Sequence, residues 1–512
     1  MGVSVFSSRI IGLVREICIA YAGGAGGSVD AYQVAFIIPE ILNHAVASGF
    51  LSITFIPIFS DFLVADREDE GWRLFSIILN TSGLFLIMLI ALSLWYAPYL
   101  VRLLAPGLTD PELFSQALAM TRIIIPAQFF FFTGGLFMAV QFAKERFFLP
   151  ALAPLIYNAG IIAGGLLLGS GMGMEGFAWG VLGGAFAGNF LLQYIGAKKA
   201  GMKLTFTLQP THPGFIKYIL LTLPLMAGLT MTFSTEIFLK YFGSFLPDGS
   251  IAALNYSLRI MFILVGVFGQ AVGVASYPFM AKLASKGDMD SLNEILNTTL
   301  KFLALVIPVS VLFMVLRHEI VMLLFQRGKF DHEATRMTAQ VLPFIMAGTF
   351  AFAAQTVVVR GYYAMGNTWF PTLFSTLSVA GSIPLFFVFM EMLGASGVAL
   401  ALALAALINT GVLFALWNRR TMNPSAGLYG FFLKIIAVTC LMGGVLTPAV
   451  RTLQGIFNNL EPTGAVFVSL ITGCLFLGMF TISGKIFKIR EISLITEKLT
   501  AIPGRLFRKW QK

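Results

Sequence analysis

The sequence has little charge and almost no cysteine or histidine. Of its 512 residues 57% are hydrophobic, and only 11% are charged, against about 25% in an average soluble domain. This scarcity of charge excludes disordered, fibrous and nucleic-acid-binding proteins. The 3 cysteines and 4 histidines are scattered, which predicts neither a disulfide framework nor a metal centre. The remaining class is a polytopic membrane protein, in which a span needs about 20 apolar residues.

Motifs of nucleotide-dependent enzymes are also missing. The glycine-rich segment 22–27 lacks the lysine and hydroxyl residue of a phosphate-binding loop, so we interpret it as a flexible hinge. No spacing typical of a nucleophile with its base occurs along the chain. We therefore expect neither an ATPase nor a metalloenzyme, and no cofactor.

Long apolar runs predict an all-α polytopic membrane protein with about 14 transmembrane helices. The runs are continuous rather than alternating, which excludes a transmembrane barrel. The predicted helices lie near 1–22, 30–63, 74–103, 117–143, 149–170, 175–197, 214–243, 250–281, 291–316, 334–364, 369–392, 396–418, 428–451 and 463–487.

The distribution of Lys and Arg predicts the orientation. Connections after even-numbered helices, with the C-terminal tail, hold about 23 Lys and Arg, and those after odd-numbered helices about six. The positive-inside rule then places both termini in the cytoplasm. The acidic stretch 66–70 falls on the same side, but acidic residues contribute little to this rule.

Four short matches indicate an internal repeat. Residues 56–59 match 277–280, which pairs Pro57 with Pro278, at an offset of 221. Further matches join 100–104 to 320–324, 124–126 to 341–343, and 147–150 to 368–371, at offsets of 220, 217 and 221. Each unit contains six helices, an even number, so the two units have parallel topology. Prolines at equivalent places suit helices that bend as a transporter rocks.

The repeat predicts the domain organisation. We expect an N-lobe of helices 1–6 over 1–200 and a C-lobe of helices 7–12 over 201–420. Helices 13 and 14 follow over 421–490, and a basic cytoplasmic tail over 491–512. Subtracting the offset from helix 7 places the start of helix 1 before Met1, so helix 1 is either naturally short or begins upstream.

The first two helices are rich in ionisable residues, which are costly inside a membrane and usually face a cavity or a partner. Arg9, Arg15 and Glu16 share one face of helix 1. They predict a cationic wall for an anionic substrate. The alternatives are that Arg15 pairs with a carboxylate for packing and that Arg9 extends to the membrane surface.

Helix 2 and the second lobe supply further candidates. Asp30, Glu40 and His44 lie on helix 2, and His44 is either a titrating group or a hydrogen-bonded structural residue. Arg259 stands alone in the middle of helix 8, where we expect it to face the cavity. Glu236 is a weak candidate for an ion site, because an ion pair with Lys240 at i+4 explains it equally well.

Several of these segments resemble the MurJ (MviN) family of lipid II flippases, within the MOP transporter superfamily. The N-terminal resemblance comprises Arg9 to Glu16, the glycine-rich turn and residues 29–39. It continues through 105–107, 256–259, the Leu-Phe-Gln-Arg-Gly-Lys-Phe element at 324–330, 361–364 and 371–372. Together these segments extend over almost the whole chain.

The resemblance implies a flippase of the bacterial cytoplasmic (inner) membrane, acting in peptidoglycan biosynthesis. Its substrate would be lipid II, an undecaprenyl-pyrophosphate glycolipid. The family's cationic cavity residues carry over to Arg9, Arg15 and Arg259, and its acidic helix-2 start to Asp30. Helices 13 and 14 would form a groove for the lipid tail. We expect a monomer that contacts membrane lipids, is not an enzyme, and is coupled to the membrane potential or to a monovalent cation.

Four positions depart from the family pattern. Relatives commonly carry a basic residue before the helix-2 proline, an Arg-Arg pair and an acidic turn; here these positions hold Ile37, Asn43, His44 and Ser48. The acidic position after Arg259 is Phe262. The alternatives therefore include a flippase for another polyprenyl-pyrophosphate glycan, such as an O-antigen or exopolysaccharide unit, and a membrane glycolipid polymerase.

Overall fold

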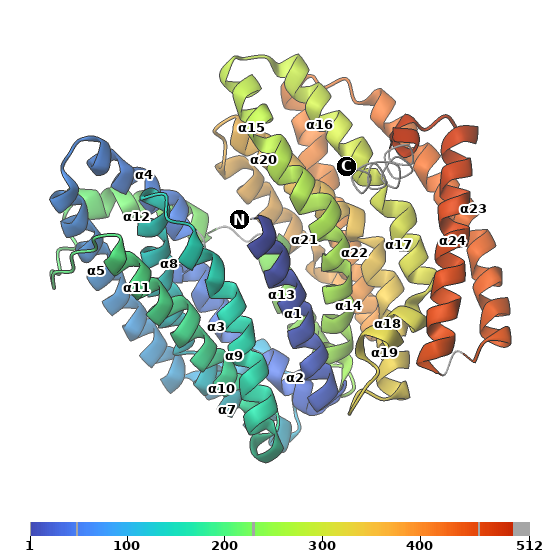
Figure 1. Cartoon of the computed structure of the whole chain (residues 1–512), viewed down its shortest axis with the longest axis horizontal. Coiled ribbons are helices and arrows are strands. Elements are labelled where there is room, and N and C mark those ends of the chain that lie inside the picture. Colours follow the sequence, from blue (N-terminus) through green and yellow to red (C-terminus); the bar gives the residue numbers. More distant parts are fainter. Residues whose placement is uncertain (1, 48–49, 228–230, 459–460, 495–512) are drawn as a thin grey trace, which may run out of the picture. The chain divides into compact units, whose positions relative to one another are not determined.

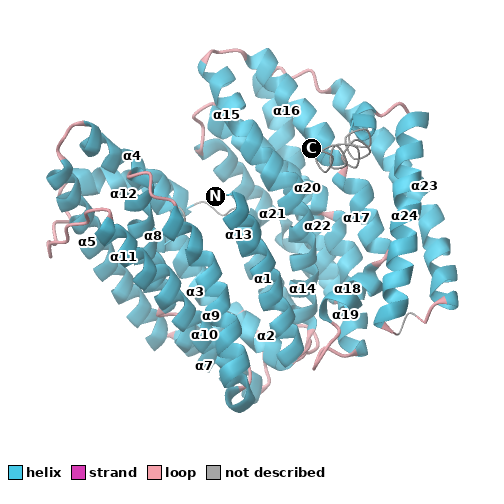
Figure 2. Ribbon diagram, in the orientation of Figure 1, coloured by secondary structure: helices cyan, strands magenta, loops and turns pink. Residues whose placement is uncertain are grey.

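The computed structural model describes residues 2–47, 50–227, 231–458 and 461–494. All of the regular structure in these ranges is helical, with no strand among them (Figure 2). Ser48 and most of the predicted basic tail lie outside the described residues.

The first half of the chain forms short and long helices, joined by short turns and by the longer connection 200–212 (Figure 1). They are α1 (Gly2–Gly23), α2 (Gly27–Val34), α3 (Ile37–Leu42), the π-helix η1 (Asn43–Ala47), α4 (Phe50–Val64), α5 (Glu68–Trp95), α6 (Ala97–Leu104), α7 (Pro111–Ile124), α8 (Ala127–Ala143), α9 (Phe148–Met172), α10 (Glu175–Gly184), η2 (Ala185–Leu191), α11 (Leu192–Lys199), α12 (Pro213–Ala227) and α13 (Met231–Gly243).

The second half continues in the same manner. Its helices are α14 (Ser250–Leu264), η3 (Val265–Gln270), α15 (Ala271–Ser285), α16 (Met289–Ala304), α17 (Val306–Val315), α18 (Arg317–Phe325), α19 (His332–Ala347), α20 (Thr349–Ala364), α21 (Trp369–Leu393), α22 (Ala395–Thr421), α23 (Ala426–Ile456) and α24 (Pro462–Ile486).

The helices are long and apolar enough to cross a membrane many times. Within the described ranges, 10 helical stretches meet that criterion, and Thr54–Val64 and Pro213–Leu223 are shorter apolar helices. Each of the fourteen predicted segments falls on one helix or on consecutive helices. The polytopic all-α fold is therefore confirmed. Helix α1 is absent from the ten because Arg9, Arg15 and Glu16 interrupt its apolar sequence.

The structure also confirms the parallel repeat and sharpens its offset to 221. Helix α4 (Phe50–Val64) corresponds to α15 (Ala271–Ser285), and α9 (Phe148–Met172) to α21 (Trp369–Leu393), at both ends. Pro57 and Pro278 occupy the same place inside α4 and α15. One predicted match is wrong: Pro126 precedes α8, whereas Pro343 lies inside α19. The residue equivalent to Pro126 is Ala347, where α19 ends.

Backbone conformation repeats at the same offset. Gly173 and Gly394, which end α9 and α21, have φ/ψ of 57°/−131° and 58°/−131°. Only glycine adopts this region without strain. Three further pairs have positive φ in both repeats: Asp66 with Gly287, Glu145 with Gly366, and Gly201 with Met422. The two repeats therefore share their turns as well as their helices.

Helix caps are duplicated too. The carboxylate of Asp110 accepts hydrogen bonds from the backbone N–H of Glu112 and Leu113, at 2.7 and 3.1 Å, and begins α7. The carboxylate of Asp331 accepts from the N–H of Ala334, at 2.9 Å, and begins α19. An acidic side chain at this position satisfies donors that the helix itself cannot satisfy.

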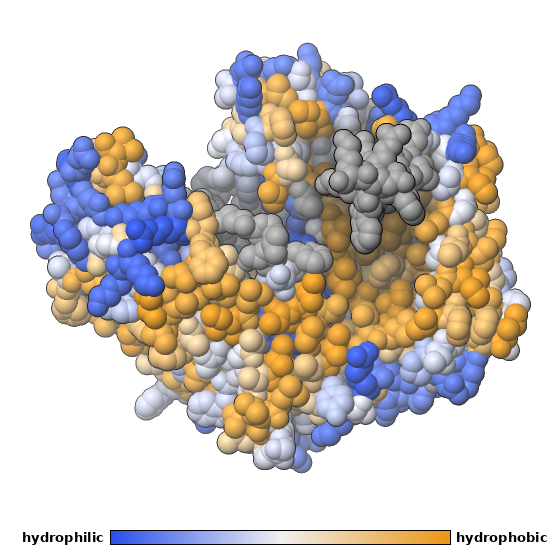
Figure 3. Space-filling model, in the orientation of Figure 1, coloured by the Kyte–Doolittle hydropathy of each residue, from blue (hydrophilic) through white to orange (hydrophobic). Residues whose placement is uncertain are grey.

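Burial separates inner helices from outer ones in the same way in both repeats. The apolar stretches of α9 and α21 are each 22% buried, whereas those of α7–α8 and α19–α20 are 61% and 67% buried. Outer helices present their apolar side chains to lipid. Over α23 and α24, Figure 3 shows hydrophobic side chains along the middle and hydrophilic ones at the two ends. This is the pattern of a membrane-exposed surface.

The described chain divides into two compact units. One contains residues 1–255 and 325–334, and the other contains 256–324 and 335–512. The first unit therefore includes α12 and α13 with the helices of the first repeat. Thr54 and Thr222 join α4 to α12 through a hydrogen bond of 3.0 Å between their hydroxyls. The lobe boundary predicted at residue 200 stays a prediction.

Candidate functional site

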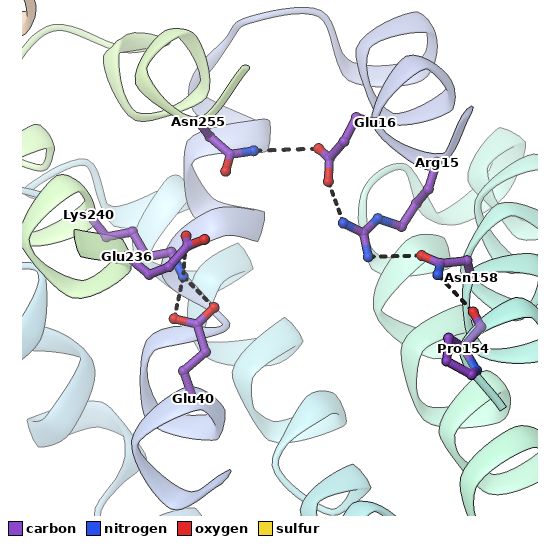
Figure 4. Close-up of polar contacts among 8 residues, drawn as sticks. All are labelled: Arg15, Glu16, Glu40, Pro154, Asn158, Glu236, Lys240 and Asn255. Carbon is purple, nitrogen blue, oxygen red and sulfur yellow. Dashed lines mark hydrogen bonds and ion pairs between the residues drawn. The ribbon is translucent and has the colours of Figure 1, made fainter. Parts of the chain in front are cut away.

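A buried polar network occupies the first compact unit, and its centre is Arg15 on α1. The guanidinium of Arg15 donates to Glu16 Oε1 at 2.5 Å and to Asn158 Oδ1, on α9, at 3.1 Å (Figure 4). The side chain of Arg15 is 21% exposed, and that of Glu16 is 4% exposed. A guanidinium has five N–H donors, so these two bonds leave donors for a further anion.

Asn158 is held in place by its own helix. Its Nδ2 donates to the carbonyl of Pro154, one turn earlier, at 2.8 Å. This bond turns the amide oxygen toward Arg15. Asn255 Nδ2 donates to the second oxygen of Glu16 at 3.4 Å. The sequence analysis missed Asn158 and Asn255; the one available signal for Asn158 is an amide within a long apolar run.

A second charged group lies across α3 and α13. Lys240 Nζ contacts both carboxylate oxygens of Glu40 at 2.7 Å, and Glu236 Oε2 at 4.0 Å (Figure 4). The predicted pair within α13 therefore exists, but the closer partner of Lys240 is Glu40. The Lys240 side chain is 4% exposed, so its charge is compensated by these carboxylates rather than by water.

Asp30, near the start of α2, anchors the start of α14. Its two carboxylate oxygens accept hydrogen bonds from the backbone N–H groups of Gly249 and Ala252, each at 2.7 Å. Asp30 is 4% exposed. Two bonds to a helix N-terminus give this residue a structural role. A direct contact of Asp30 with substrate stays a prediction.

Two of the residues that depart from the family pattern have partners in this unit. The ring of His44 stacks on Phe233, with centroids 4.0 Å apart and planes inclined by 12°. Asn43 Nδ2 donates to Gln128 Oε1 at 3.1 Å. Ile37 is buried in α3, 1% exposed. An arginine at position 43 would therefore replace a hydrogen bond, and one at position 44 would replace a stacking contact.

Arg9 and Arg259 are the two predicted residues that remain. Arg9 is exposed on α1, two turns before Arg15. Arg259 belongs to the second compact unit, where it is half-buried on α14. Nearby in that unit, Ser257 Oγ donates to the carbonyl of Thr338 at 3.2 Å, which joins α14 to α19.

The network as a whole is not strongly cationic. Arg15 and Lys240 supply two positive charges, and Glu16, Glu40 and Glu236 supply three negative ones. The predicted cationic wall stays a prediction; in this unit its basic residues are Arg9 and Arg15, and Arg15 has donors left. Among the described residues, no group of three or more His, Cys, Asp or Glu side chains is arranged to hold a metal ion.

The glycine-rich turn and the 324–330 element pack on each other. Lys329 N donates to the carbonyl of Tyr21 at 2.9 Å. A Cβ on Gly24 (φ +70°) would lie 2.5 Å from Lys329 O, and a Cβ on Gly328 (φ +62°) would lie 2.5 Å from Tyr21 O. Both positions therefore require glycine. The glycine-rich turn at 22–27, which we interpreted as a flexible hinge, is thus in close backbone contact with residues 328 and 329 on one side.

The first repeat has a corresponding close contact. Gly107, 221 residues before Gly328, donates its N–H to Ser244 Oγ at 3.1 Å. A Cβ on Gly107 would lie 2.2 Å from Ser244 O. This contact explains the glycine in the 105–107 segment.

Comparisons with known proteins extend over nearly the whole chain. A probable lipid II flippase MurJ from Thermotoga maritima is 28% identical over 494 residues, 96% of each chain. The lipid II flippase MurJ of Burkholderia cenocepacia is 27% identical, covering 86% of this chain and 87% of its own.

Solved structures show the same fold. A lipid II flippase MurJ in an inward closed conformation has a TM-score of 0.77 at 24% identity, and covers 95% of this chain and 99% of its own. An inward-facing multidrug resistance MATE transporter of the MOP superfamily has a TM-score of 0.68 at 13% identity, covering 81% and 94%. The chain thus shares its fold with these two transporters.

A family model supplies the assignment. The model for lipid II flippase MurJ matches residues 19–461, most of the chain and both repeats. With the two-repeat helical fold and the charged first helix, this match shows that the chain belongs to the MurJ family of lipid II flippases.

Proposed function

We propose that this chain is a lipid II flippase, which moves the undecaprenyl-pyrophosphate-linked peptidoglycan precursor from the inner to the outer leaflet of the cytoplasmic membrane. The observation that carries the proposal is Arg15, held between Glu16 and Asn158 with unused donors, in a chain of this family. A pyrophosphate suits arginine because the planar guanidinium forms two parallel charge-assisted hydrogen bonds.

The protein's part in this process is binding and release. Alternating access exposes the binding residues first to one side of the membrane and then to the other. Asn158 fixes the direction of the Arg15 guanidinium, and Glu16 offsets part of its charge. Partial neutralisation favours transport, because a cargo that is bound too tightly is not released. No covalent bond of the substrate changes, so the chain acts as a transporter and not as an enzyme.

We propose that α23 and α24 hold the polyprenyl tail. The two helices lie side by side (Figure 1). Large apolar side chains on them are exposed, including Leu433 at 71%, Leu441 at 61% and Leu470 at 61%. An apolar surface of this kind is stable only against hydrocarbon.

The proposed membrane is the bacterial inner membrane, with both termini and the 198–217 loop in the cytoplasm. Residues 104–116 and 317–333 then face the periplasm. Single cysteines at these places, in a chain lacking Cys18, Cys440 and Cys474, report the side through an impermeant thiol reagent. Labelling of the 198–217 loop in cells opened only at the outer membrane would reverse this orientation.

We further propose that transport by the monomer is coupled to the membrane potential or to a monovalent cation gradient. Ionophores can collapse the membrane potential and the cation gradient separately in cells that depend on this chain. The ionophore that stops transport identifies the energy source. Transport that continues when both are collapsed rejects this coupling.

Complementation of a strain depleted of its own lipid II flippase tests the main proposal. We expect growth with this chain. Purified protein should also bind lipid II, and Asn43→Arg with His44→Arg should tighten that binding, because each added charge-assisted hydrogen bond contributes about 1.5–3 kcal/mol. Native mass spectrometry compares lipid II with an O-antigen-type polyprenyl-pyrophosphate sugar. Good binding of the sugar lipid with no measurable binding of lipid II would reject lipid II as the substrate.

A further inference from the structure

A second polar site lies in the other compact unit, at one end of α17, α19 and α23. A cavity of about 560 Å³ opens there, within the roughly 300–1,000 Å³ typical of ligand pockets. Each helix contributes one face: 311, 314 and 315 from α17, 336, 339 and 340 from α19, and 443, 447, 450, 451 and 454 from α23. These spacings of three, four and seven residues place each set on a single side of its helix.

The mouth of the cavity is cationic. Arg317, Arg336 and Arg451 line it together with His318. All three arginines are exposed, and none of them forms an ion pair with another described residue. His318 Nδ1 is buried and has no hydrogen-bond partner in the described part of the chain.

The neighbouring carboxylate forms no ion pair with these arginines in the described part of the chain. Glu319 follows His318 but is fully buried, 0% exposed. Its Oε1 accepts a hydrogen bond from Gln454 Nε2 at 2.6 Å, which joins α18 to α23, and its Oε2 is buried with no hydrogen-bond partner in the described part of the chain. The three guanidiniums therefore face the cavity with their donors available.

The inner wall of the cavity is apolar. Val311, Met314 and Val315 of α17 and Val450 of α23 line it. Val315 and Val450 also belong to a hydrophobic cluster between α17, α18 and α23. A ligand that fits both parts carries an anionic group at the mouth and an apolar group inside. A lipid with a phosphate headgroup has this chemistry.

The charge distribution along the sequence sets this site apart. On the same predicted side of the membrane, the other connections contain no Lys or Arg; these are 23–29, 104–116, 171–174, 244–249 and 393–395. The positive-inside rule accounts for their absence there. It does not account for Arg317, Arg336 and Arg451, which line this cavity. Figure 3 shows hydrophilic side chains there, next to α18 and α19.

We propose that this cavity binds the phosphate or pyrophosphate group of a lipid in the outer leaflet, with Arg317, Arg336 and Arg451 as the binding residues. The lipid's apolar part lies against α17 and α23. This site is distinct from the Arg15 network and does not depend on the proposed transport of lipid II.

The test compares two lipids and one free anion. Purified protein is titrated in native mass spectrometry with phosphatidylglycerol, undecaprenyl pyrophosphate and inorganic pyrophosphate. The variant combines Arg317→Gln, Arg336→Gln and Arg451→Gln. The matched control is Arg419→Gln, which changes an exposed arginine in the last turn of α22 that does not line the cavity. We expect the triple variant to lose one tightly bound lipid per protein, and its affinity to fall about tenfold for each guanidinium removed.

The arms identify the source of the phosphate. If the triple variant loses binding of both lipids, the cavity recognises the lipid phosphate itself. If it loses binding of one lipid only, that lipid is the ligand. Binding of inorganic pyrophosphate at the same affinity as the lipids, or equal lipid binding by wild type, control and triple variant, would overturn the proposal. If the triple variant unfolds, the single variants Arg336→Gln and Arg451→Gln decide between these outcomes.

Discussion

In the first repeat Arg15 of α1 contacts Asn158 of α9; 221 residues later, the same two positions hold Glu236 and Val379. Val379 is buried, 1% exposed, on α21, a helix with the same length and the same final glycine conformation as α9. The backbone is thus duplicated, while the polar contact occurs once. Helix bounds, caps and turns are therefore shared by the two repeats, whereas these polar side chains are not.

Three other ionisable residues have an apolar residue at the equivalent position, unlike Arg15 and Glu236, which are both ionisable. Glu40 corresponds to Met261, His44 to Val265, and Arg259 to Ile38. In each pair one repeat has an ionisable residue, and the other repeat has an apolar residue at the position 221 residues away. Substitution of the ionisable residue should therefore affect activity. Substitution of a backbone position that both repeats share should affect stability in the same way in either repeat.

The largest expected effect follows removal of the guanidinium of Arg15. Arg15→Ala should abolish complementation of the flippase-depleted strain, and Arg259→Ala should do the same. Lysine at either position should rescue only in part, because a point charge does not reproduce the planar fork. Immunoblots of membranes must show normal protein levels. As a repeat control, Val379→Ala changes the position equivalent to Asn158 and should leave growth intact. Full activity of both arginine-to-alanine variants would reject the site.

The next effect concerns the buried Lys240 and the partly exposed Glu40. Lys240→Met removes the cation beside two partly exposed carboxylates and should destabilise the protein by at most about 3 kcal/mol, the lower end of the range for a fully buried pair. Adding Glu40→Gln and Glu236→Gln should restore most of that loss, because no charge then remains in the group. Thermal unfolding in detergent measures both variants. Equal melting temperatures for wild type and Lys240→Met would show that the pair does not stabilise this unit.

A smaller effect, in the same direction in the two repeats, is expected at the close glycine contacts. Gly107→Ala and Gly328→Ala each place a Cβ within 2.5 Å of a backbone carbonyl oxygen. Both should lower stability by about 1–3 kcal/mol, since the backbone must move apart. Gly169→Ala is the matched control, because a Cβ there has no atom within 4 Å. A loss in one repeat only would contradict the equivalence of the two contacts.

The smallest effect concerns a turn that both repeats share. Met422 has φ 52° and ψ 39°, a left-handed conformation, at the position equivalent to Gly201 (φ 92°). Met422→Gly should stabilise the protein by up to about 1 kcal/mol, because glycine adopts this conformation without steric cost. Gly201→Met should destabilise it by a similar amount. Melting temperatures that shift in the same direction for both variants would contradict this reasoning.

The helices and the repeat were predictable from the sequence, because apolar periodicity and duplicated prolines are local signals. Arg15, Glu16 and Asp30 were recognised as candidates for the same reason, since charge within an apolar run stands out. Their partners were not recognised. Lys240 and Glu40 are 200 residues apart in the sequence. Asn158 is a single uncharged amide within a long apolar run, which is a weak signal.

The errors have a physical origin too. The match of Pro126 with Pro343 relied on three residues, and proline is tolerated both at a helix start and inside a helix when the chain bends. The role of Asp30 as an anchor for α14 depends on a fold that brings 30 and 249 together. Tertiary contacts of this kind have no periodic signal in the sequence.

The most direct measurement of the central claim is the amount of lipid II in the outer leaflet of cells that lack their own flippase. A lipid II-specific probe applied from outside reports it, before and after expression of this chain. We predict that outer-leaflet lipid II rises with the wild-type chain and stays at the depleted level with Arg15→Ala present at the same amount in the membrane. An unchanged level with the wild-type chain, correctly inserted and abundant, would contradict the assignment of this chain as a lipid II flippase.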